Sequence, residues 1–197
     1  MYIPKIKYIK SLGISLKTSS FKNFIDISSL VYYKKYEIVE RRDNTLIKEL
    51  DITNQKIAEE VLKIQLLSYK VEAEIIGFFE LPPLKDTVKT LQQCGETFFG
   101  YFVNNELCGA ISIKKAEKNI IDIHRLLVHP KHFRKGIAEK LLTIIERNRE
   151  AEKVIVSTGS KNTPAVRFYL KHGFQIVEER KVNEHLFLTH FEKKRPF

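Results

Sequence analysis

The segment Val128–Leu142, VHPKHFRKGIAEKLL, constrains the fold most, because a strand must turn into a helix within a few residues. An apolar strand pattern precedes it, and the segment ends in an amphipathic helix pattern. The turn itself holds a proline, several basic residues, a lone glycine at Gly136 and a small residue at Ala138. Such a turn can be an ordinary connection. It can also bind an anion, because a helix N-terminus has free N–H groups and a partial positive charge.

The rest of the chain predicts further elements in the order β-α-α-β-β-β-α-β-α-β-β from Thr45 onward. Thr53 can cap the first helix, and Asn104 with Asn105 suits a hairpin turn. Asn162 is a plausible N-cap for the last helix, which Gly173 should end. We therefore expect one α/β (α+β) domain over residues 45–197 and an N-terminal extension over residues 1–44.

Charge and cysteine content narrow the function classes. The formal net charge is +10, which favours anionic partners. The basic residues are scattered without a long run, so nucleic acid is not an expected partner. Cys94 and Cys108 match no metal or redox spacing, and neither a secretory leader nor a membrane-spanning stretch is visible. We expect a cytoplasmic protein with no metal and no membrane association.

Two motifs together carry a family resemblance. The segment around Gly136 and Ala138 resembles the pyrophosphate motif Gln/Arg-x-x-Gly-x-Gly/Ala of the GNAT superfamily of N-acetyltransferases, with Phe133 at the leading position and Arg134 one place later. The segment NTPAVRFYLKHGF resembles the family's Asn-x-x-Ala-x-x-x-Tyr-x-x-x-Gly-Phe pattern, matched by Asn162, Ala165, Tyr169, Gly173 and Phe174.

The resemblance implies the acyl-CoA N-acyltransferase (GNAT) fold: a twisted mixed sheet with flanking helices and splayed central strands. It also implies transfer of an acetyl group from acetyl-CoA to a primary amine of a small molecule or a protein. The expected partners are acetyl-CoA and this amine acceptor, and a homodimer is left open. The implied acetyl-CoA positions are Leu126, Leu127, Val128, Arg134, Lys135, Gly136, Ile137, Ala138, Glu139 and Asn162.

Two residues are the implied catalytic groups, and each also has a structural interpretation. Tyr169 matches the family's general acid, or it is a core aromatic beside Phe168. His124 is the candidate base, with Asp122 on the same strand face, or it is a strand histidine bonded to a carbonyl. Asn162 can bind the ligand, cap its helix, or do both. Ser157 stands where some similar proteins have a glutamate base.

The acceptor side is less defined. The segment SYKVEAEIIGFFELPPL joins the first two predicted helices and contains Glu72, Glu74 and Glu80 among aromatic residues and prolines. These carboxylates suit a cationic amine, or they are solvated helix charges. A non-catalytic module of the same fold, which binds acyl-CoA or a protein partner, is the alternative to an enzyme.

Overall fold

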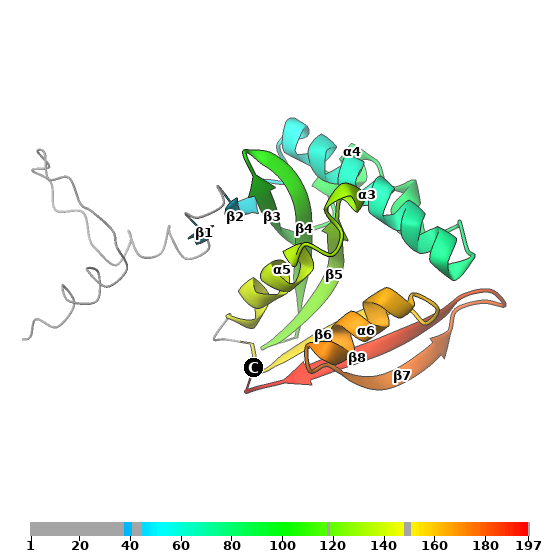
Figure 1. Cartoon of the computed structure of the whole chain (residues 1–197). Helices are drawn as coiled ribbons and strands as arrows, with labels where there is room; N and C mark the ends of the chain where they lie inside the picture. Colours follow the sequence, from blue (N-terminus) through cyan, green and yellow to red (C-terminus); the bar gives the residue numbers. More distant parts are fainter. Residues whose placement is uncertain (1–37, 41–44, 118, 148–150, 197) are drawn as a thin grey trace, which may run out of the picture. The chain divides into compact units, whose positions relative to one another are not determined.

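The computed structural model describes residues 38–40, 45–117, 119–147 and 151–196 (Figure 1). Most of the expected extension, residues 1–37 and 41–44, lies outside the described residues. Residues 38–40 form strand β1, which pairs with β2. The elements follow the expected order, with β1 and two short 3-10 helices added: β1 (Ile38–Glu40), β2 (Thr45–Leu50), α3 (Gln55–Ile76), η1 (Pro82–Lys85), α4 (Val88–Gln92), β3 (Thr97–Val103), β4 (Glu106–Glu117), β5 (Ile120–Val128), η2 (Pro130–His132), α5 (Ile137–Glu146), β6 (Lys153–Gly159), α6 (Thr163–Lys171), β7 (Gln175–Lys181) and β8 (Phe187–Lys194).

These strands form one mixed sheet in the order β1-β2-β3-β4-β5-β6-β8-β7. Neighbouring strands are antiparallel except β5 and β6, which are parallel and joined through α5. The β3–β4 hairpin turns at Asn104 and Asn105, which both have positive φ, as the sequence predicts. The expected mixed sheet with flanking helices is confirmed.

The two parallel strands diverge halfway along their length. They pair only from Ile120 with Lys153 to Ile123 with Val156. Beyond that point β5 continues against β4 as far as Val128, and β6 continues against β8 as far as Gly159. Figure 1 shows the two strands separating, so the expected splayed centre is confirmed.

A β-bulge lies in β5 where the strands begin to part. Ile113 of β4 faces Ile123, but the next residue, Ser112, faces Arg125, which leaves His124 without a partner across the ladder. The extra residue shifts the alternation of the strand. Ile123 before the bulge and Leu126 after it therefore both pack against the same cluster of core residues.

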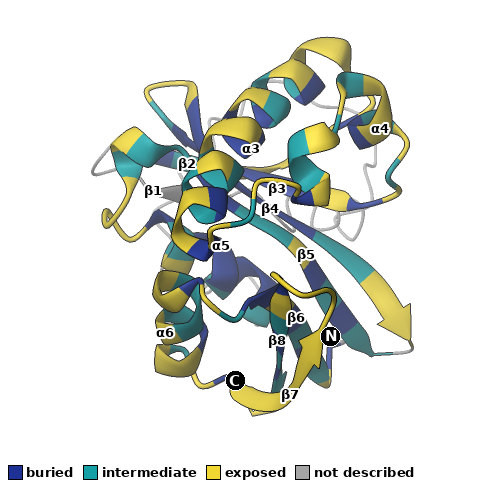
Figure 2. Ribbon diagram, turned by 90° about the vertical axis from the view of Figure 1, so that its right-hand side faces the viewer, coloured by how far each residue is buried: buried dark blue, intermediate teal, exposed yellow. Residues whose placement is uncertain are grey.

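The helices cover the two faces of the sheet separately. Helices α5 and α6 pack on one face in a core cluster that includes Leu141, Tyr169 and Phe191. Helices α3 and α4 pack on the other face in a second cluster around Leu91 and Phe98. Figure 2 shows this layering, with the buried strands between the helices.

The start of α3 differs from the sequence expectation by one residue. Asn54 is the N-cap, and its side chain accepts hydrogen bonds from the amides of Lys56 and Ile57. The hydroxyl and amide of Thr53 both donate to Asp51, at 2.6 and 3.1 Å. Thr53 is therefore the wrong cap, because a neighbouring carboxylate already engages its side chain.

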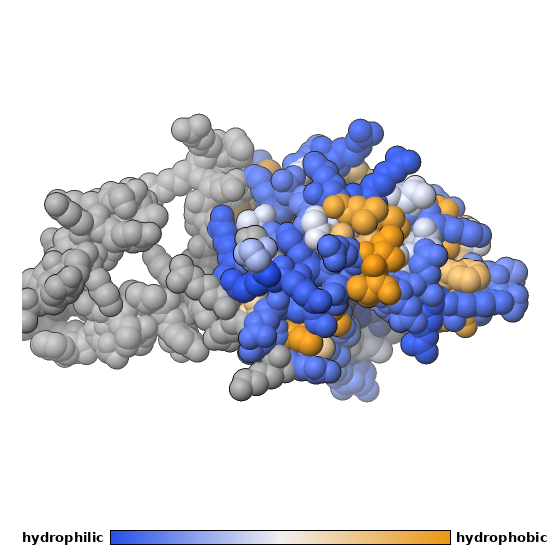
Figure 3. All heavy atoms as spheres, turned by 90° about the horizontal axis from the view of Figure 1, so that it is seen from below, coloured by the Kyte–Doolittle hydropathy of each residue, from blue (hydrophilic) through white to orange (hydrophobic). Residues whose placement is uncertain are grey.

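Strand β7 is the edge of the sheet and is exposed along its whole length. Ile176 and Val177 are among the exposed large hydrophobic residues, and hydrophobic side chains gather on the face seen in Figure 3. Of the helices that the structure describes, none combines the length and the apolar composition that a membrane crossing requires.

Candidate active site

A cavity of about 1070 Å³ opens where β5 and β6 part. Its walls come from both faces of the sheet: α3, Leu81 and the start of η1 on one side, and the turn before α5, together with α6, on the other. The ends of β5 and β6 form its floor. The splay of the sheet therefore creates the site, because the helices on opposite faces reach the same space only there.

The turn before α5 borders this cavity. Gly136 is the N-cap of α5 with φ +76°, and no side chain caps the helix. A Cβ at Gly136 would meet no atom within 4 Å. The first N–H groups of α5 thus have no side-chain partner and adjoin open space, which favours the anion-site interpretation over a plain connection.

Basic side chains surround the same end of the cavity. Arg134 of the turn and Arg167 and Lys171 of α6 are exposed and line it. Lys135 does not line the cavity, and its Nζ lies 3.4 Å from the Nδ1 of His132. The basic charges of the turn and of α6 therefore add to the partial charge of the helix terminus.

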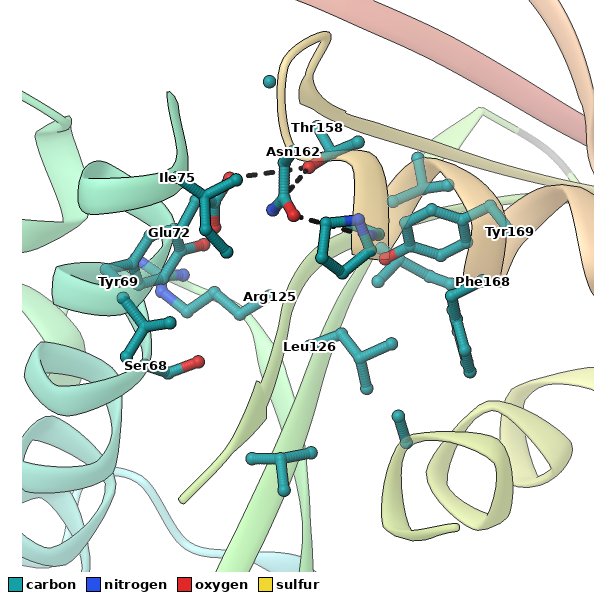
Figure 4. Close-up of a pocket in the computed structure, with 18 of the residues that line it drawn as sticks. Ser68, Tyr69, Glu72, Ile75, Arg125, Leu126, Thr158, Asn162, Phe168 and Tyr169 are labelled. Atoms are coloured by element: carbon teal, nitrogen blue, oxygen red, sulfur yellow. Dashed lines mark hydrogen bonds between the residues drawn. The ribbon is translucent and has the colours of Figure 1, made fainter. Parts of the chain in front are cut away.

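Tyr169 of α6 is 5% exposed and lines the cavity on the opposite wall from α3. Its ring packs against Phe174 and Phe191, with centroids 5.4 and 5.5 Å away. Figure 4 shows its hydroxyl directed toward the space between α6 and β5. Burial raises the pKa of Tyr169 far above its ordinary range, so the phenol keeps its proton at neutral pH.

Asn162 links α6 to β6 and α3. Its Oδ1 accepts from the amide of Ala165 at 3.3 Å, so it caps α6 as the sequence predicts. Its Nδ2 donates to Thr158 Oγ1 at 3.4 Å, and that hydroxyl donates to Glu72 Oε1 at 3.4 Å. These bonds appear as dashed lines in Figure 4.

Of the three carboxylates expected on the acceptor side, Glu72 alone lines the cavity. Glu74 is exposed outside it, and Glu80 pairs with Lys85 at 2.6 Å on the surface. Burial raises the pKa of the Glu72 carboxyl above its usual range, against the lowering effect of its hydrogen bonds. The solvated interpretation therefore suits Glu74 and Glu80 but not Glu72.

A polar network centred on Arg125, which lines the cavity, was not predicted from the sequence. Its guanidinium donates to three acceptors: Gln65 Oε1 at 3.0 Å, Asp86 Oδ2 at 3.1 Å and the carboxylate of Glu96. Ser112 also donates to Glu96 at 2.7 Å. The broken alternation of apolar residues between Ile123 and Leu126 was the signal of the bulge that turns Arg125 toward these partners.

His124 lines the cavity beside this network. Its Nδ1 lies 3.4 Å from Glu96 Oε1, and its Nε2 lies 3.3 Å from Asp122 Oδ2. Both ring nitrogens therefore face carboxylates. One nitrogen would have to move away from its carboxylate before His124 could accept a proton from a substrate. Its role as a base stays a prediction.

Ser157 also lines the cavity, and its hydroxyl is 2.6 Å from the Nδ1 of His190 on β8. The Nε2 of His190 is buried without a hydrogen-bond partner among the described residues. Within the described ranges, no group of His, Cys, Asp and Glu side chains is arranged to hold a metal ion.

The structure brings most of the predicted site residues to one cavity. Those that line it are His124, Leu126, Val128, Arg134, Gly136, Ile137, Ala138, Glu139, Asn162 and Tyr169. The side chain of Leu127 instead packs in the cluster beneath α3 and α4. A backbone contact at Leu127 and the ligand contacts of the other residues stay predictions.

A mixed sheet split between two parallel strands, with an uncapped helix terminus at the opening, is the arrangement expected of the GNAT fold. Residues 84–195 match the family model described as acetyltransferase (GNAT) domain. The chain belongs to this family.

Two relatives and one solved structure illustrate the similarity. The chain is 43% identical to the UPF0157 protein YqkA of Bacillus subtilis (strain 168) over 147 residues, which are 74% of this chain and 43% of that protein. It is 25% identical to streptothricin acetyltransferase of Escherichia coli over 131 residues, 64% of this chain and 74% of that protein. The paia N-acetyltransferase of Thermoplasma acidophilum, solved in complex with coenzyme A, has a TM-score of 0.60 at 20% identity, over 75% of this chain and 98% of that one.

Proposed function

We propose that this chain is an N-acetyltransferase that moves an acetyl group from acetyl-CoA to a primary amine, with Tyr169 as general acid. One observation carries the proposal: a single cavity joins the uncapped N-terminus of α5 to the buried hydroxyl-bearing ring of Tyr169. The anion site and the proton donor can therefore act on the two ends of one ligand.

The residues at the turn fit the pyrophosphate of acetyl-CoA. The open space at Gly136 would admit it, and the amides of residues 134–139 would donate hydrogen bonds to it. Arg134, Arg167 and Lys171 would supply charge for the phosphates. The edge of β5 over residues 126–128, which β6 does not pair, would offer backbone groups to the pantetheine arm.

When bound, acetyl-CoA would supply an acetyl thioester. The amine nitrogen would form a bond to its carbonyl carbon, and the carbon–sulfur bond would break. Tyr169 stays protonated in its buried position and would donate this proton to the leaving sulfur. His124 would accept the proton of the amine at Nε2 once Asp122 has released that nitrogen.

Gly136→Glu tests the anion site. The new side chain would project into the space that the pyrophosphate needs, and its charge would repel the phosphates. Coenzyme A should raise the melting temperature of the native protein but not of this variant. Gly77→Glu is the matched control, because Gly77 also has a positive φ, of +77°, and open space at its Cβ but lies outside the cavity. If coenzyme A raises the melting temperature of native protein and of both folded variants equally, it binds elsewhere.

Turnover of acetyl-CoA distinguishes an enzyme from a non-catalytic module of the same fold. Native protein should release free thiol from acetyl-CoA in the presence of a panel of amines. Binding of coenzyme A without turnover of any amine would favour the module instead.

A further inference from the structure

We propose that Glu72 binds a positively charged group of the acceptor that is separate from the amine being acetylated. The substrate class would then be amines with a second cationic centre joined through an apolar segment. This inference rests on the proposed function, and it names the acceptor that the same cavity selects.

The position of Glu72 suits contact with the acceptor. It lies on α3, across the cavity from Tyr169 and α6 (Figure 4). Thr158 Oγ1 donates to its Oε1 at 3.4 Å, which holds the carboxylate at the end of β6. Gly159 adjoins it, because a Cβ at that glycine would lie 3.9 Å from Glu72 Oε1.

No basic side chain of the described residues forms an ion pair with Glu72. Arg125, the cationic residue of β5 in the cavity wall, already donates to Gln65, Glu96 and Asp86. Burial of an unpaired carboxylate costs free energy, and a ligand cation would offset this cost.

The other Arg and Lys side chains that line the cavity come from the turn and from α6. Arg134 is in the turn before α5, Arg167 is at the middle of α6, and Lys171 is the last residue of that helix. Asn162, which is linked to Glu72 through Thr158, caps the opposite end of that helix. The cavity is thus positive at the turn and negative at α3, so that it can hold an anionic donor and a cationic acceptor together.

Apolar side chains also lie beside Glu72. Ile75 and Tyr69 lie three residues away on the same face of α3, and Figure 4 shows both beside it. Leu81 and Leu186 line the cavity from the neighbouring loops. An aliphatic segment would pack here, and the ring of Tyr69 gives an ammonium a second favourable surface.

We take the group that Glu72 holds to be separate from the reacting amine. An amine attacks a carbonyl only in its neutral form, whereas a carboxylate stabilises the protonated form. A cation at Glu72 would therefore stay unreactive and position the rest of the acceptor. A substrate with both groups satisfies the two requirements at once.

The test compares short α,ω-diamines with monoamines of the same chain lengths as acceptors. In Glu72→Gln, the KM for diamines should rise by about 10- to 100-fold, since a charge-assisted hydrogen bond is lost. The kcat for diamines and both constants for monoamines should stay within about threefold of native. Glu74→Gln is the control, because Glu74 lies on the same helix outside the cavity and should behave as native for every amine.

Two kinetic outcomes would overturn the proposal. One is an equal loss for diamines and monoamines, and the other is a fall in kcat that rising pH relieves, which would make Glu72 a base. Calorimetric binding of a diamine to the coenzyme A complex tests the carboxylate independently of turnover. Weaker binding by Glu72→Gln than by native protein supports the proposal even if neither protein acetylates an amine, in which case the proposed function fails. Equal affinity refutes this inference while leaving the proposed function standing.

Discussion

Arg125→Met should destabilise the fold strongly, because it leaves a buried carboxylate without its cation. The side chains of Arg125 and Glu96 are 11% and 4% exposed. Removing one member of such a pair typically costs about 3–5 kcal/mol in the free energy of unfolding. Ser112 would still donate to Glu96 at 2.7 Å, and His124 Nδ1 would still lie 3.4 Å from its other oxygen. We therefore expect Arg125→Met to lower the free energy of unfolding by about 3 kcal/mol, the lower end of this range.

A double-mutant cycle isolates the pair from the rest of the network. Glu96→Gln keeps an acceptor oxygen, and Arg125 would still donate to Asp86 at 3.1 Å, so this change should cost about 1–3 kcal/mol. The double variant should be less destabilised than the sum of the two single variants, by at least about 1 kcal/mol. Urea unfolding, with its slope checked against native, measures each value.

The cycle has a surface control in the Lys85–Glu80 pair, whose side chains are 65% and 70% exposed. Lys85→Met should leave the urea midpoint close to native, because solvent screens an exposed pair. A loss below about 1 kcal/mol for Arg125→Met, or additivity within about 0.5 kcal/mol, would show that the network does not stabilise the fold.

Tyr169→Phe keeps the ring packed against Phe174 and Phe191 but removes the proton, so kcat should fall by about 10²–10⁴-fold with little change in coenzyme A affinity; a kcat within about twofold of native would contradict the acid role. Glu72→Gln should change stability with pH, because burial raises the folded-state pKa of Glu72 above the ordinary glutamate value of 4.5. The stability that protonated Glu72 contributes is lost as pH rises through the folded-state pKa. The variant should therefore melt above native protein at neutral pH and lose this advantage below pH 4.5. A melting-temperature difference that is constant from neutral to acidic pH would contradict this reasoning.

Local sequence signals determined the elements and one end of the cavity. Asn104 and Asn105 predicted the hairpin turn, and Asn162 predicted the start of α6, because each acts through bonds within a few residues. The turn at Gly136 was predicted for the same reason. The positive φ of this glycine at the start of α5 depends on the local backbone and not on distant contacts. The prediction of Thr53 as the cap of α3 was wrong, because the hydroxyl of Thr53 donates to Asp51 and Asn54 caps the helix.

Only the tertiary structure decided which polar side chains meet. Gln65, Asp86 and Glu96 converge on Arg125 from separate elements, and a one-residue bulge in β5 aims Arg125 at them. Glu72 and Glu74 are two residues apart on α3, yet of the two only Glu72 lines the cavity. Their difference arises because the splay of β5 and β6 opens space against one face of α3, and pairing between distant strands sets where that opening lies.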